Sequence, residues 1–410
     1  MAFNGQIHTS HGIPHVKMKS VEMLLSKKFA EFFAGIGLMR MGLEQAGWKI
    51  AFANDIDPVK YQLYAHHFSD AGQHFILGDI HSLPGASVPS VALATASFPC
   101  NDLSLAGMRE GLGGKHSSAY WGFIRILREM GSRKPPIVLV ENVAGFLTSH
   151  KGNDLAAALE ALNSLGYVVD VFILDAVNFV PQSRIRVFIV GSTLINKTEI
   201  CVKSPHFYES EVRPRAIAEF IYSHPEIIWR IRNLPKLPTR KAKLVNILED
   251  LPDDSPLWWK SARTDYLLAQ MSPKHKDQLR GMMNERSWSY GTVFRRVRQG
   301  RSMAELRIDG IAGCLRTPRG GSGRQILLRA GHGSVMARLI TPRECAKLMG
   351  ADDFQIETSL NKALFGFGDA VCVPAVRWIA ENYLDPLVNE MIQKTEGQFS
   401  RPRTIAADIR

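Results

Sequence analysis

The sequence predicts an α/β fold with a mostly parallel sheet and helices on both faces, joined to a smaller and more irregular domain. Two observations predict it. Over residues 29–203 short apolar runs alternate with amphipathic stretches, which is the pattern of strand–helix units. From about residue 204 to residue 337 this alternation stops, and prolines, tryptophans and arginines become frequent. We interpret this change as the boundary of a second domain.

The first strand–helix unit has the strongest signals. Residues 27–35 are an apolar run that ends in a glycine turn, so we expect a strand there. Residues 38–47 form an amphipathic stretch closed by Gly47, which predicts a helix, and residues 49–57 predict the second strand. Further strands are expected over residues 74–80, 91–99, 136–143, 167–175 and 186–192, with helices over residues 58–68, 118–131 and 153–165.

Helical patterning returns after the irregular segment. Residues 338–351 and 364–391 have helical periodicity, and we expect the whole segment 338–394 to pack back on the first domain. Residues 1–28 are predicted to be a flexible N-terminal arm, and residues 395–410 a C-terminal tail. The chain is therefore expected to contain a first domain over 29–203, a second over 204–337 and a returning C-terminal segment.

The composition is that of a globular protein without membrane or disulfide signals. The chain has 410 residues, of which 45% are hydrophobic and 22% charged. We find no apolar run of the ~20 residues needed to cross a bilayer, and residues 1–28 lack the apolar core of a secretory signal. The five cysteines form no CxxC pair, which argues against a disulfide framework or a structural zinc site. We expect a cytoplasmic protein with free thiols and no metal.

The net charge of +11 is concentrated in one segment. Residues 1–200 carry +1, residues 201–337 carry +11 and residues 338–410 carry −1. An uneven basic load suggests a surface that binds a polyanion, because each phosphate neutralised by Lys or Arg releases condensed counterions. The alternative is a solvated basic face without a ligand.

Three successive strand ends present residues suited to a nucleoside. Gly35 and Gly37 lie at the first strand-to-helix turn, where small residues let a cofactor approach the backbone. Asp55 ends the second strand, where a carboxylate commonly accepts ribose hydroxyls, and Asp79 ends the third, where it suits an adenine amino group. The chain lacks a P-loop lysine and the full GxGxxG spacing, so we expect an adenosine cofactor without a pyrophosphate. S-adenosylmethionine is the candidate.

Cys100 follows the fourth strand, in the stretch FPCNDLSLAG, and is therefore expected beside the cofactor crevice. A lone cysteine is ordinarily a small buried apolar residue, and we assign Cys201, Cys314, Cys345 and Cys372 to that class. The loop position of Cys100 differs. Its thiolate would be a strong nucleophile if a nearby positive group lowered its pKa.

Six blocks of the chain resemble the motifs of DNA (cytosine-5) methyltransferases. They are FFAGIGL, FPCNDLSLAG, VENV, QSRIRVF, RLITPRECAKLMG and GFGDAVCVPAV, and they follow that family's order from residue 29 to about residue 391. The resemblance implies a Rossmann-like, S-adenosylmethionine-dependent methyltransferase domain and a target-recognition domain over residues 204–337. It also implies methyl transfer to carbon 5 of cytosine in a specific double-stranded DNA sequence.

The resemblance implies a role for each catalytic candidate. Cys100 would add to carbon 6 of a flipped-out cytosine, because carbon 5 is by itself a poor nucleophile. Glu141 would hydrogen-bond ring nitrogen 3, and Arg186 would hold the exocyclic oxygen. Arg184 would support the catalytic loop or the charge balance of the site, and Asn142 would brace the Pro-Cys segment.

Two further sets of residues follow from the same resemblance. The cofactor set is Phe33, Ala34, Gly35, Gly37, Leu38, Asp55, Ile56, Asp79, Ile80, Pro99, Asp369 and Ala370. The DNA-binding set is Asn101, Ser104, Gln182, Arg295, Arg296, Arg316, Arg319 and Arg324. In residues 292–302 and 315–333, Arg combined with Gly would let guanidinium and backbone groups approach phosphates and guanine edges.

The chain departs from the family's pattern at three places. Asn101 stands where Gln is usual, and Asp369 stands where Asn is usual, which adds a negative charge near the expected cofactor. The usual Arg-Gly of the intervening motif is missing from residues 115–124. None of these changes removes a group that performs a chemical step, so we expect activity.

Two other functions stay open at this point. Some relatives methylate cytosine in transfer RNA, but their recognition region is compact, whereas the one expected here has about 130 residues, which favours duplex DNA. The second alternative is a catalytically silent DNA-binding or regulatory protein, suggested by Asn101 and Asp369. The presence of Cys100, Glu141 and Arg186 argues against it.

The family resemblance also implies a biological setting. Bacterial members usually protect host DNA within restriction-modification or phage-defence systems. We therefore expect a cytoplasmic, nucleoid-associated monomer whose partners are double-stranded DNA and a cognate restriction endonuclease or other defence proteins.

Overall fold

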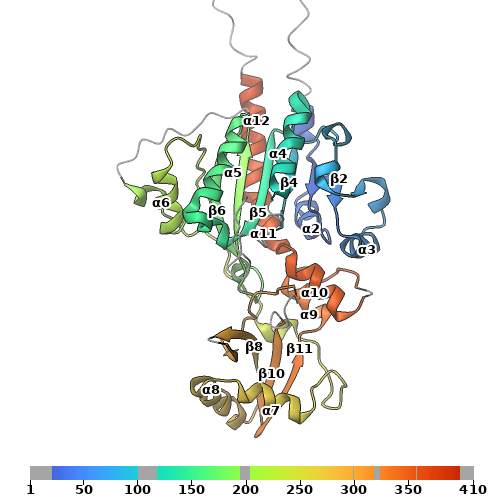
Figure 1. The fold of residues 1–410 in the computed structure, drawn as a ribbon, viewed down its shortest axis with the longest axis vertical. Helices are drawn as coiled ribbons and strands as arrows, with labels where there is room; N and C mark the ends of the chain where they lie inside the picture. The colour runs from blue at the N-terminus through green and yellow to red at the C-terminus, as the bar shows by residue number, and fades with distance from the viewer. Residues whose placement is uncertain are drawn as a thin grey trace, which may run out of the picture.

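The computed structural model describes residues 21–99, 118–193, 204–298, 300–317, 324–356 and 358–397. Figure 1 shows two bodies stacked along the long axis of the molecule. The large domain at the top is built on a seven-stranded sheet, and the small domain at the bottom on a four-stranded sheet. Helices α9 (Pro342–Leu348) and α10 (Leu360–Asp369) lie between them.

The large sheet has the strand order β3-β2-β1-β4-β5-β7-β6. Its strands are β1 (Lys28–Phe32), β2 (Lys49–Asp55), β3 (Phe75–Leu77), β4 (Leu93–Ala96), β5 (Ile137–Val143), β6 (Val168–Asp175) and β7 (Ile185–Ser192). Among these seven strands, β7 runs in the direction opposite to the other six. The strand order reverses between β1 and β4, and ligands of such sheets bind outside the carboxyl ends of the strands at that point.

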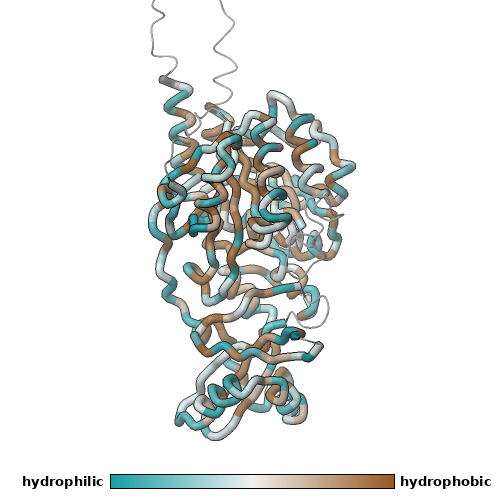
Figure 2. The backbone as a smooth tube through the Cα atoms, turned by 60° about the vertical axis from the view of Figure 1, so that its left-hand side comes forward, coloured by the Kyte–Doolittle hydropathy of each residue, from teal (hydrophilic) through white to brown (hydrophobic). Residues whose placement is uncertain are grey.

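Helices cover both faces of this sheet because its central strands are apolar on both sides. On one face Leu93 and Ile137 pack with α2 (Leu38–Gln45), α11 (Val373–Ile379) and α12 (Asp385–Gly397). On the other face Ala94 and Val138 pack with α4 (Ala119–Met130) and α5 (Asn153–Ser164). Figure 2 shows the resulting apolar strands running through the interior. The predicted α/β fold is confirmed.

The remaining predicted elements of the large domain are also present. The helix expected over residues 58–68 is α3 (Pro58–His67). Asp57 caps its N-terminus, because the Asp57 carboxylate accepts hydrogen bonds from the amides of Val59 and Lys60. The helical stretch expected over residues 364–391 is interrupted, because α10 ends at Asp369 and α11 begins at Val373. This break brings the end of α10 to the carboxyl edge of the sheet.

The small domain is an antiparallel sheet with helices against it. Its strand order is β11-β10-β8-β9, formed by β8 (Ser289–Arg298), β9 (Arg301–Arg307), β10 (Ile326–Gly331) and β11 (Ser334–Leu339). Helices α7 (Ser261–Ala269) and α8 (Pro273–Asn284) contribute Leu267 and Leu279 to a core shared with Val293 and Leu328 of the sheet. We use the name small domain for residues 259–339.

Residues 204–232, which the sequence analysis assigned to the second domain, pack on the large domain. Helix α6 (Arg215–Ser223) lies beside β6 and far from the small sheet (Figure 1). Arg213 donates to both carboxylate oxygens of the fully buried Asp170 at 2.8 Å, and Trp229 pairs with the edge of β6. Burying Asp170 requires a cationic partner, and Arg213 supplies it from this segment.

The net charge also differs between segment 204–232 and the small domain. Residues 204–232 contain four Lys and Arg and four Asp and Glu, so their net charge is zero. Residues 259–339 contain 16 Lys and Arg and five Asp and Glu, a net charge of +11. The whole basic excess of the protein therefore resides in the small domain.

One stretch, Leu360–Thr395, is long and apolar enough to cross a membrane by length and composition. However, 72% of its most apolar window is buried inside the protein. Its residues Val376, Ile379, Leu387 and Met391 belong to the core on one face of the large sheet. Packing within the protein therefore accounts for its hydrophobicity.

Candidate active site

A cavity of about 260 Å³ lies at the carboxyl ends of β1, β2, β4 and β5. It therefore sits at the reversal of the strand order, where the fold places ligands. Residues of the expected catalytic and cofactor sets meet in its lining: Phe33, Ala34, Gly35, Leu38, Asp55, Ile56, Pro99, Glu141, Asn142, Arg186, Asp369 and Ala370.

The turn between β1 and α2 needs its two glycines for different reasons. Gly35 lines the cavity with φ of 56°, a left-handed conformation that side chains disfavour, and its amide donates to Asp55 Oδ2 at 2.8 Å. Gly37 has φ of 84°, and a Cβ atom there would come within 2.4 Å of the Phe68 ring. Gly37 does not line the cavity, so its role in the structure is the close packing of the turn against α3.

Asp55 is fixed in orientation at the end of β2. One carboxylate oxygen accepts from the Gly35 amide and the other from the Asp57 amide at 2.9 Å. The side chain is buried, and this burial raises its pKa although the Lys60 ammonium opposes the shift. Each oxygen keeps a lone pair that can accept a hydrogen bond from a ligand hydroxyl group.

Glu31, which the sequence analysis did not select, lines the same cavity from β1. It is only 2% exposed, and its Oε2 atom has no hydrogen-bond partner among the described residues. Burial raises the pKa of its carboxyl to about 8, although the Arg40 guanidinium lowers it. Burying a carboxyl oxygen without a partner is unfavourable, so this oxygen is suited to accept a hydrogen bond from a donor or to pair with a cation.

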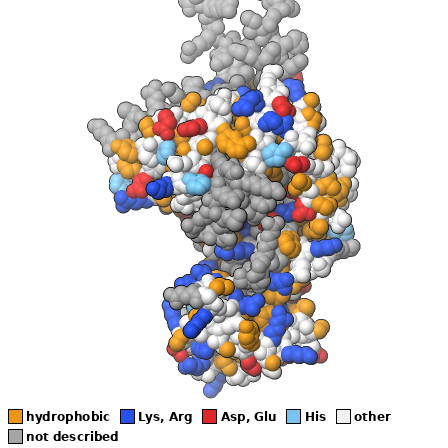
Figure 3. Space-filling model, viewed as in Figure 1, with side chains coloured by type: hydrophobic (Ala, Val, Ile, Leu, Met, Phe, Trp, Pro, Cys, Tyr) orange, Lys and Arg blue, Asp and Glu red, His pale blue; other side chains and the backbone are white. Residues whose placement is uncertain are grey.

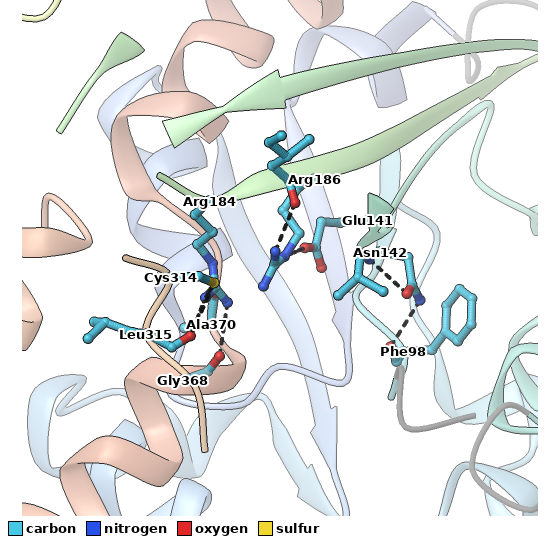
Figure 4. A network of polar contacts seen from close by, with 11 residues as sticks. Phe98, Glu141, Asn142, Arg184, Arg186, Cys314, Leu315, Gly368 and Ala370 are labelled. Carbon is cyan, nitrogen blue, oxygen red and sulfur yellow. Dashed lines mark hydrogen bonds and ion pairs between the residues drawn. The ribbon is translucent and has the colours of Figure 1, made fainter. Parts of the chain in front are cut away.

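Glu141 and Arg186 both line the cavity and form an ion pair there (Figure 4). The antiparallel pairing of β5 and β7 places Val143 opposite Arg186, so the Arg186 side chain reaches back to Glu141. The Arg186 Nε atom lies 2.9 Å from Glu141 Oε1, and both side chains are largely buried. Burial raises the pKa of Glu141, and Arg186 and Arg184 oppose this shift. The group is therefore a carboxyl that takes up a proton more readily than an exposed glutamate.

Asn142 connects this pair to the segment that follows β4. Its Nδ2 atom donates to the carbonyl of Phe98 at 3.2 Å, and its Oδ1 atom accepts from the Val143 amide. Pro99 lines the cavity, and Cys100 is the next residue. Cys100 itself, and with it Asn101 and Ser104, lies outside the described residues.

Arg184 does not line the cavity, but it donates hydrogen bonds to residues that do. It is 2% exposed, and its Nη1 atom contacts the sulfur of Cys314 at 3.2 Å and the carbonyl of Leu315 at 2.9 Å. Its Nη2 atom donates to the carbonyls of Gly368 and Ala370 at 3.0 and 2.5 Å (Figure 4). Arg184 thus ties Cys314 and Leu315 of the small domain to Gly368 and Ala370 at the end of α10, which line the cavity.

Gln182 has a comparable role, which differs from the expected contact with DNA. It is fully buried, its Nε2 atom donates to the Leu348 carbonyl at 2.7 Å and its Oε1 atom accepts from the Leu315 amide at 2.9 Å. A side chain with no exposed atom and with both ends of its amide engaged does not contact DNA directly. In this structure Gln182 positions the connection between the domains.

Besides Gly37, two residues of the expected cofactor set, Asp79 and Ile80, lie outside the cavity lining. Asp79 is exposed, and its carboxylate accepts from the amide of His81 at 2.9 Å. Ile80 is buried in the core beneath α4. Both residues follow β3 in the chain.

The expected DNA-binding arginines that the structure describes belong to the small domain. Arg295 and Arg296 lie on β8, and Arg296 pairs with Glu305 at 3.2 Å. Arg316 is exposed, and Arg324 donates to Asn361 of α10 at 2.8 Å. Arg319 lies outside the described residues. Figure 3 shows Lys and Arg side chains spread over the small domain at the bottom of the view.

The model of the C-5 cytosine-specific DNA methylase family matches residues 27–385. The chain belongs to this family. The methyltransferase is 28% identical to the type II methyltransferase M.DsaV of Dactylococcopsis salina over 360 residues, covering 87% of this chain and 86% of that protein. It is 26% identical to the type II methyltransferase M.HhaI of Haemophilus parahaemolyticus over 366 residues, covering 88% and 95%.

A solved structure supports the fold. The S. pombe Dnmt2 methyltransferase superposes with a TM-score of 0.57 at 16% sequence identity, covering 88% of this chain and 98% of that one. At this identity the likeness concerns the fold alone. Family membership makes the enzyme a DNA (cytosine-5) methyltransferase with S-adenosylmethionine as its methyl donor, which confirms the predicted activity and cofactor.

The cavity fits this cofactor. S-adenosylmethionine carries a ribose, a positively charged sulfonium and an ammonium group. The cavity offers the Asp55 carboxylate for hydroxyl groups and the Glu31 oxygen without a partner for a donor or cation. Phe33 and Ile56 contribute apolar surface. Among the described residues no cluster of three or more His, Cys, Asp or Glu suited to a metal is present.

Proposed function

We propose that this methyltransferase modifies cytosine in one short sequence of double-stranded DNA through a covalent bond between Cys100 and carbon 6 of a flipped-out base. The observation that carries the proposal is the Glu141–Arg186 pair, which shares a cavity with the cofactor residues and with Pro99, the neighbour of Cys100. A base in this cavity would meet an acid, a cation and a nucleophilic loop at once.

Each step of the proposed reaction can be assigned to one of these residues or to the cofactor. The Cys100 thiolate forms a bond to carbon 6, and the electrons of the carbon 5–carbon 6 double bond move to carbon 5. Glu141, which holds a proton readily because of its burial, donates a hydrogen bond to ring nitrogen 3 and offsets the added charge. Arg186 holds the exocyclic oxygen. When bound, S-adenosylmethionine supplies an electrophilic methyl group. Loss of the carbon 5 proton to water then expels the thiolate and restores the double bond.

The small domain is proposed to bind the DNA. Extracting a base from the duplex costs a few kcal/mol of stacking and pairing, and contacts to the phosphates offset this cost. The net charge of +11 on residues 259–339 supports this assignment. Among the expected DNA-binding residues, Arg295, Arg296 and Arg316 are the described ones for which we propose contacts with DNA.

We further propose that the enzyme protects host DNA within a restriction-modification or phage-defence system. The type II methyltransferases M.DsaV and M.HhaI are relatives along most of the chain. Such a role implies a cognate endonuclease or other defence proteins as partners, action as a monomer, and location in the cytoplasm at the nucleoid.

The first experiment is methyl transfer to DNA of mixed sequence. The purified protein and its Cys100→Ser variant are incubated with methyl-labelled S-adenosylmethionine, and modified cytosines are mapped by bisulfite sequencing. We expect methylation in one sequence context with the unaltered protein and none with the variant.

Transfer RNA serves as the competing substrate in the same assay. Label that enters transfer RNA and not DNA would contradict the proposed substrate. Label that enters DNA equally with Cys100→Ser would contradict the proposed nucleophile. Thermal unfolding of the variant verifies that it is folded.

A further inference from the structure

Lys60 and Asp369 form an ion pair at the cofactor cavity. The Lys60 Nζ atom, on α3, lies 2.8 Å from Oδ2 of Asp369, the last residue of α10. Both residues line the cavity, although 308 residues separate them in the chain. The lysine side chain is 20% exposed and the aspartate side chain 45%, so the pair lies where a ligand can reach it.

The charges of the residues that line the cavity indicate a role for this ion pair. Five acidic residues line the cavity: Glu31, Asp55, Asp57, Glu141 and Asp369. The cationic side chains among the described lining residues are those of Lys60 and Arg186. Arg186 is paired with Glu141 on the side assigned to the base. Lys60 is therefore the cation on the side of Asp55, where the cofactor binds.

The cofactor itself has one anionic group, the carboxylate of its methionine moiety. A carboxylate that enters a site lined by acids is repelled unless a cation faces it. Burial lowers the pKa of Lys60, but Asp369 and Asp55 more than compensate and raise it, so the ammonium group stays charged.

We propose that Lys60 binds the carboxylate of the methionine moiety and that Asp369 is a positioning residue that holds the Lys60 side chain over the cavity. The pair also accounts for the aspartate that replaces the usual asparagine of the family, since Lys60 neutralises the added charge. The inference depends on S-adenosylmethionine as cofactor, and it does not depend on the chemistry proposed for Cys100.

The test compares two ligands by titration calorimetry with the full chain. S-adenosylhomocysteine has the carboxylate, whereas 5′-deoxy-5′-methylthioadenosine lacks the whole amino-acid moiety. For Lys60→Gln we expect affinity for S-adenosylhomocysteine to fall roughly ten- to a hundredfold, the usual effect of losing a charge-assisted hydrogen bond. Affinity for methylthioadenosine should change by less than about twofold, because that ligand lacks the group that Lys60 binds.

Further variants distinguish the attraction of the ligand carboxylate by Lys60 from its repulsion by Asp369. Lys60→Arg should retain most of the affinity for S-adenosylhomocysteine. The double variant Lys60→Gln with Asp369→Asn should bind it more tightly than Lys60→Gln alone, because the unpaired Asp369 carboxylate no longer repels the ligand. Lys49→Gln, at an exposed lysine at the start of β2, is the matched control and should behave as the unaltered protein.

Equal losses for both ligands in Lys60→Gln would mean that the pair only connects α3 and α10, and would overturn the proposal. An unchanged affinity for S-adenosylhomocysteine would overturn it as well. Because calorimetry reads binding without methyl transfer, either result stands apart from the outcome of the Cys100 experiment.

Discussion

Glu31 and Glu141 are two buried carboxyl groups in one cavity with different surroundings. Glu141 has Arg186 at 2.9 Å, so its charge is balanced when it ionises. Glu31 has an oxygen without a partner among the described residues, and the charged groups that act on it are Arg40 and Glu44 of α2 and Asp55 of β2. The first group suits proton donation, and the second suits a ligand.

Glu31 makes the stability of the protein without its cofactor depend on pH. In the unfolded chain its pKa lies near the ordinary value of 4.5, and in the fold it is raised to about 8. Between these values the folded protein holds a proton that the unfolded chain has lost, so this contribution to stability falls as the pH rises toward 8. Each tenfold difference in proton affinity corresponds to about 1.4 kcal/mol.

Glu31→Gln should remove this dependence. The free energy of unfolding, measured in urea at several pH values from 5.5 to 8.5, should decline less steeply for the variant than for the unaltered protein. The amide does not ionise, so the gain in stability should be largest at the alkaline end. Two curves that run parallel over this range would contradict the protonation of Glu31 in the fold.

At the scale of elements, the active site depends on contacts between segments that are distant in sequence. Arg184, directly before β7, contacts Cys314 and Leu315 of the small domain and also Gly368 and Ala370 at the end of α10. Gln182 joins the same connection to the end of α9. Arg184 and Gln182 therefore fix the position of the small domain relative to the residues that line the cavity.

Arg184→Lys should therefore affect both stability and cofactor binding. The planar guanidinium of Arg184 reaches both segments at once, and a lysine ammonium cannot. Buried carbonyl groups would therefore lose their hydrogen-bond donors. We expect a loss of roughly 2–4 kcal/mol in the free energy of unfolding. We also expect weaker binding of S-adenosylhomocysteine, because the segment Gly368–Ala370 lines the cavity.

The control for this variant is Arg377→Lys. Arg377 is exposed and pairs with Glu381 one turn away, and exposed pairs of this kind contribute about 0–1 kcal/mol. Denaturation and calorimetry on both variants provide the comparison. Equal stability of Arg184→Lys and Arg377→Lys would refute the connecting role of Arg184.

At the scale of the whole molecule, the charge is divided between two bodies. The small domain carries a net +11, whereas the neutral segment 204–232 packs on the large domain beside β6. We therefore expect binding to DNA to depend on salt through the small domain. The logarithm of the binding constant should fall linearly with the logarithm of the salt concentration.

Substitutions of two exposed arginines, one in each body, test whether the small domain binds the DNA. Arg316→Gln, in the small domain, should weaken binding across DNA sequences and reduce the salt slope by about 0.9 if Arg316 contacts one phosphate. Arg215→Gln, on α6, should leave both quantities unchanged. Binding measured by fluorescence anisotropy from 50 to 200 mM salt decides the point. A reduced slope for Arg215→Gln and not for Arg316→Gln would contradict the assignment of the DNA surface to the small domain.

The sequence by itself determined the features that depend on neighbours along the chain. Strands such as β4 and β5 are visible as apolar runs because both of their faces are buried, and the turn at Gly35 is visible because a left-handed backbone favours glycine. The order of the motifs implied the family, the activity and the cofactor, and these are confirmed. The assignment of Cys100 as nucleophile stays a prediction, since that residue lies outside the described part of the chain.

Only the tertiary structure decided which side chains meet. No motif in the sequence singles out Lys60, because its partner Asp369 is distant in the chain, and Gln182 was expected to contact DNA although the fold buries it. The assignment of residues 204–232 changed because Asp170 takes its buried partner Arg213 from there. The physical reason is common to all three. Periodicity and turn chemistry report local conformation, whereas burial and charge pairing depend on neighbours that are brought together by folding.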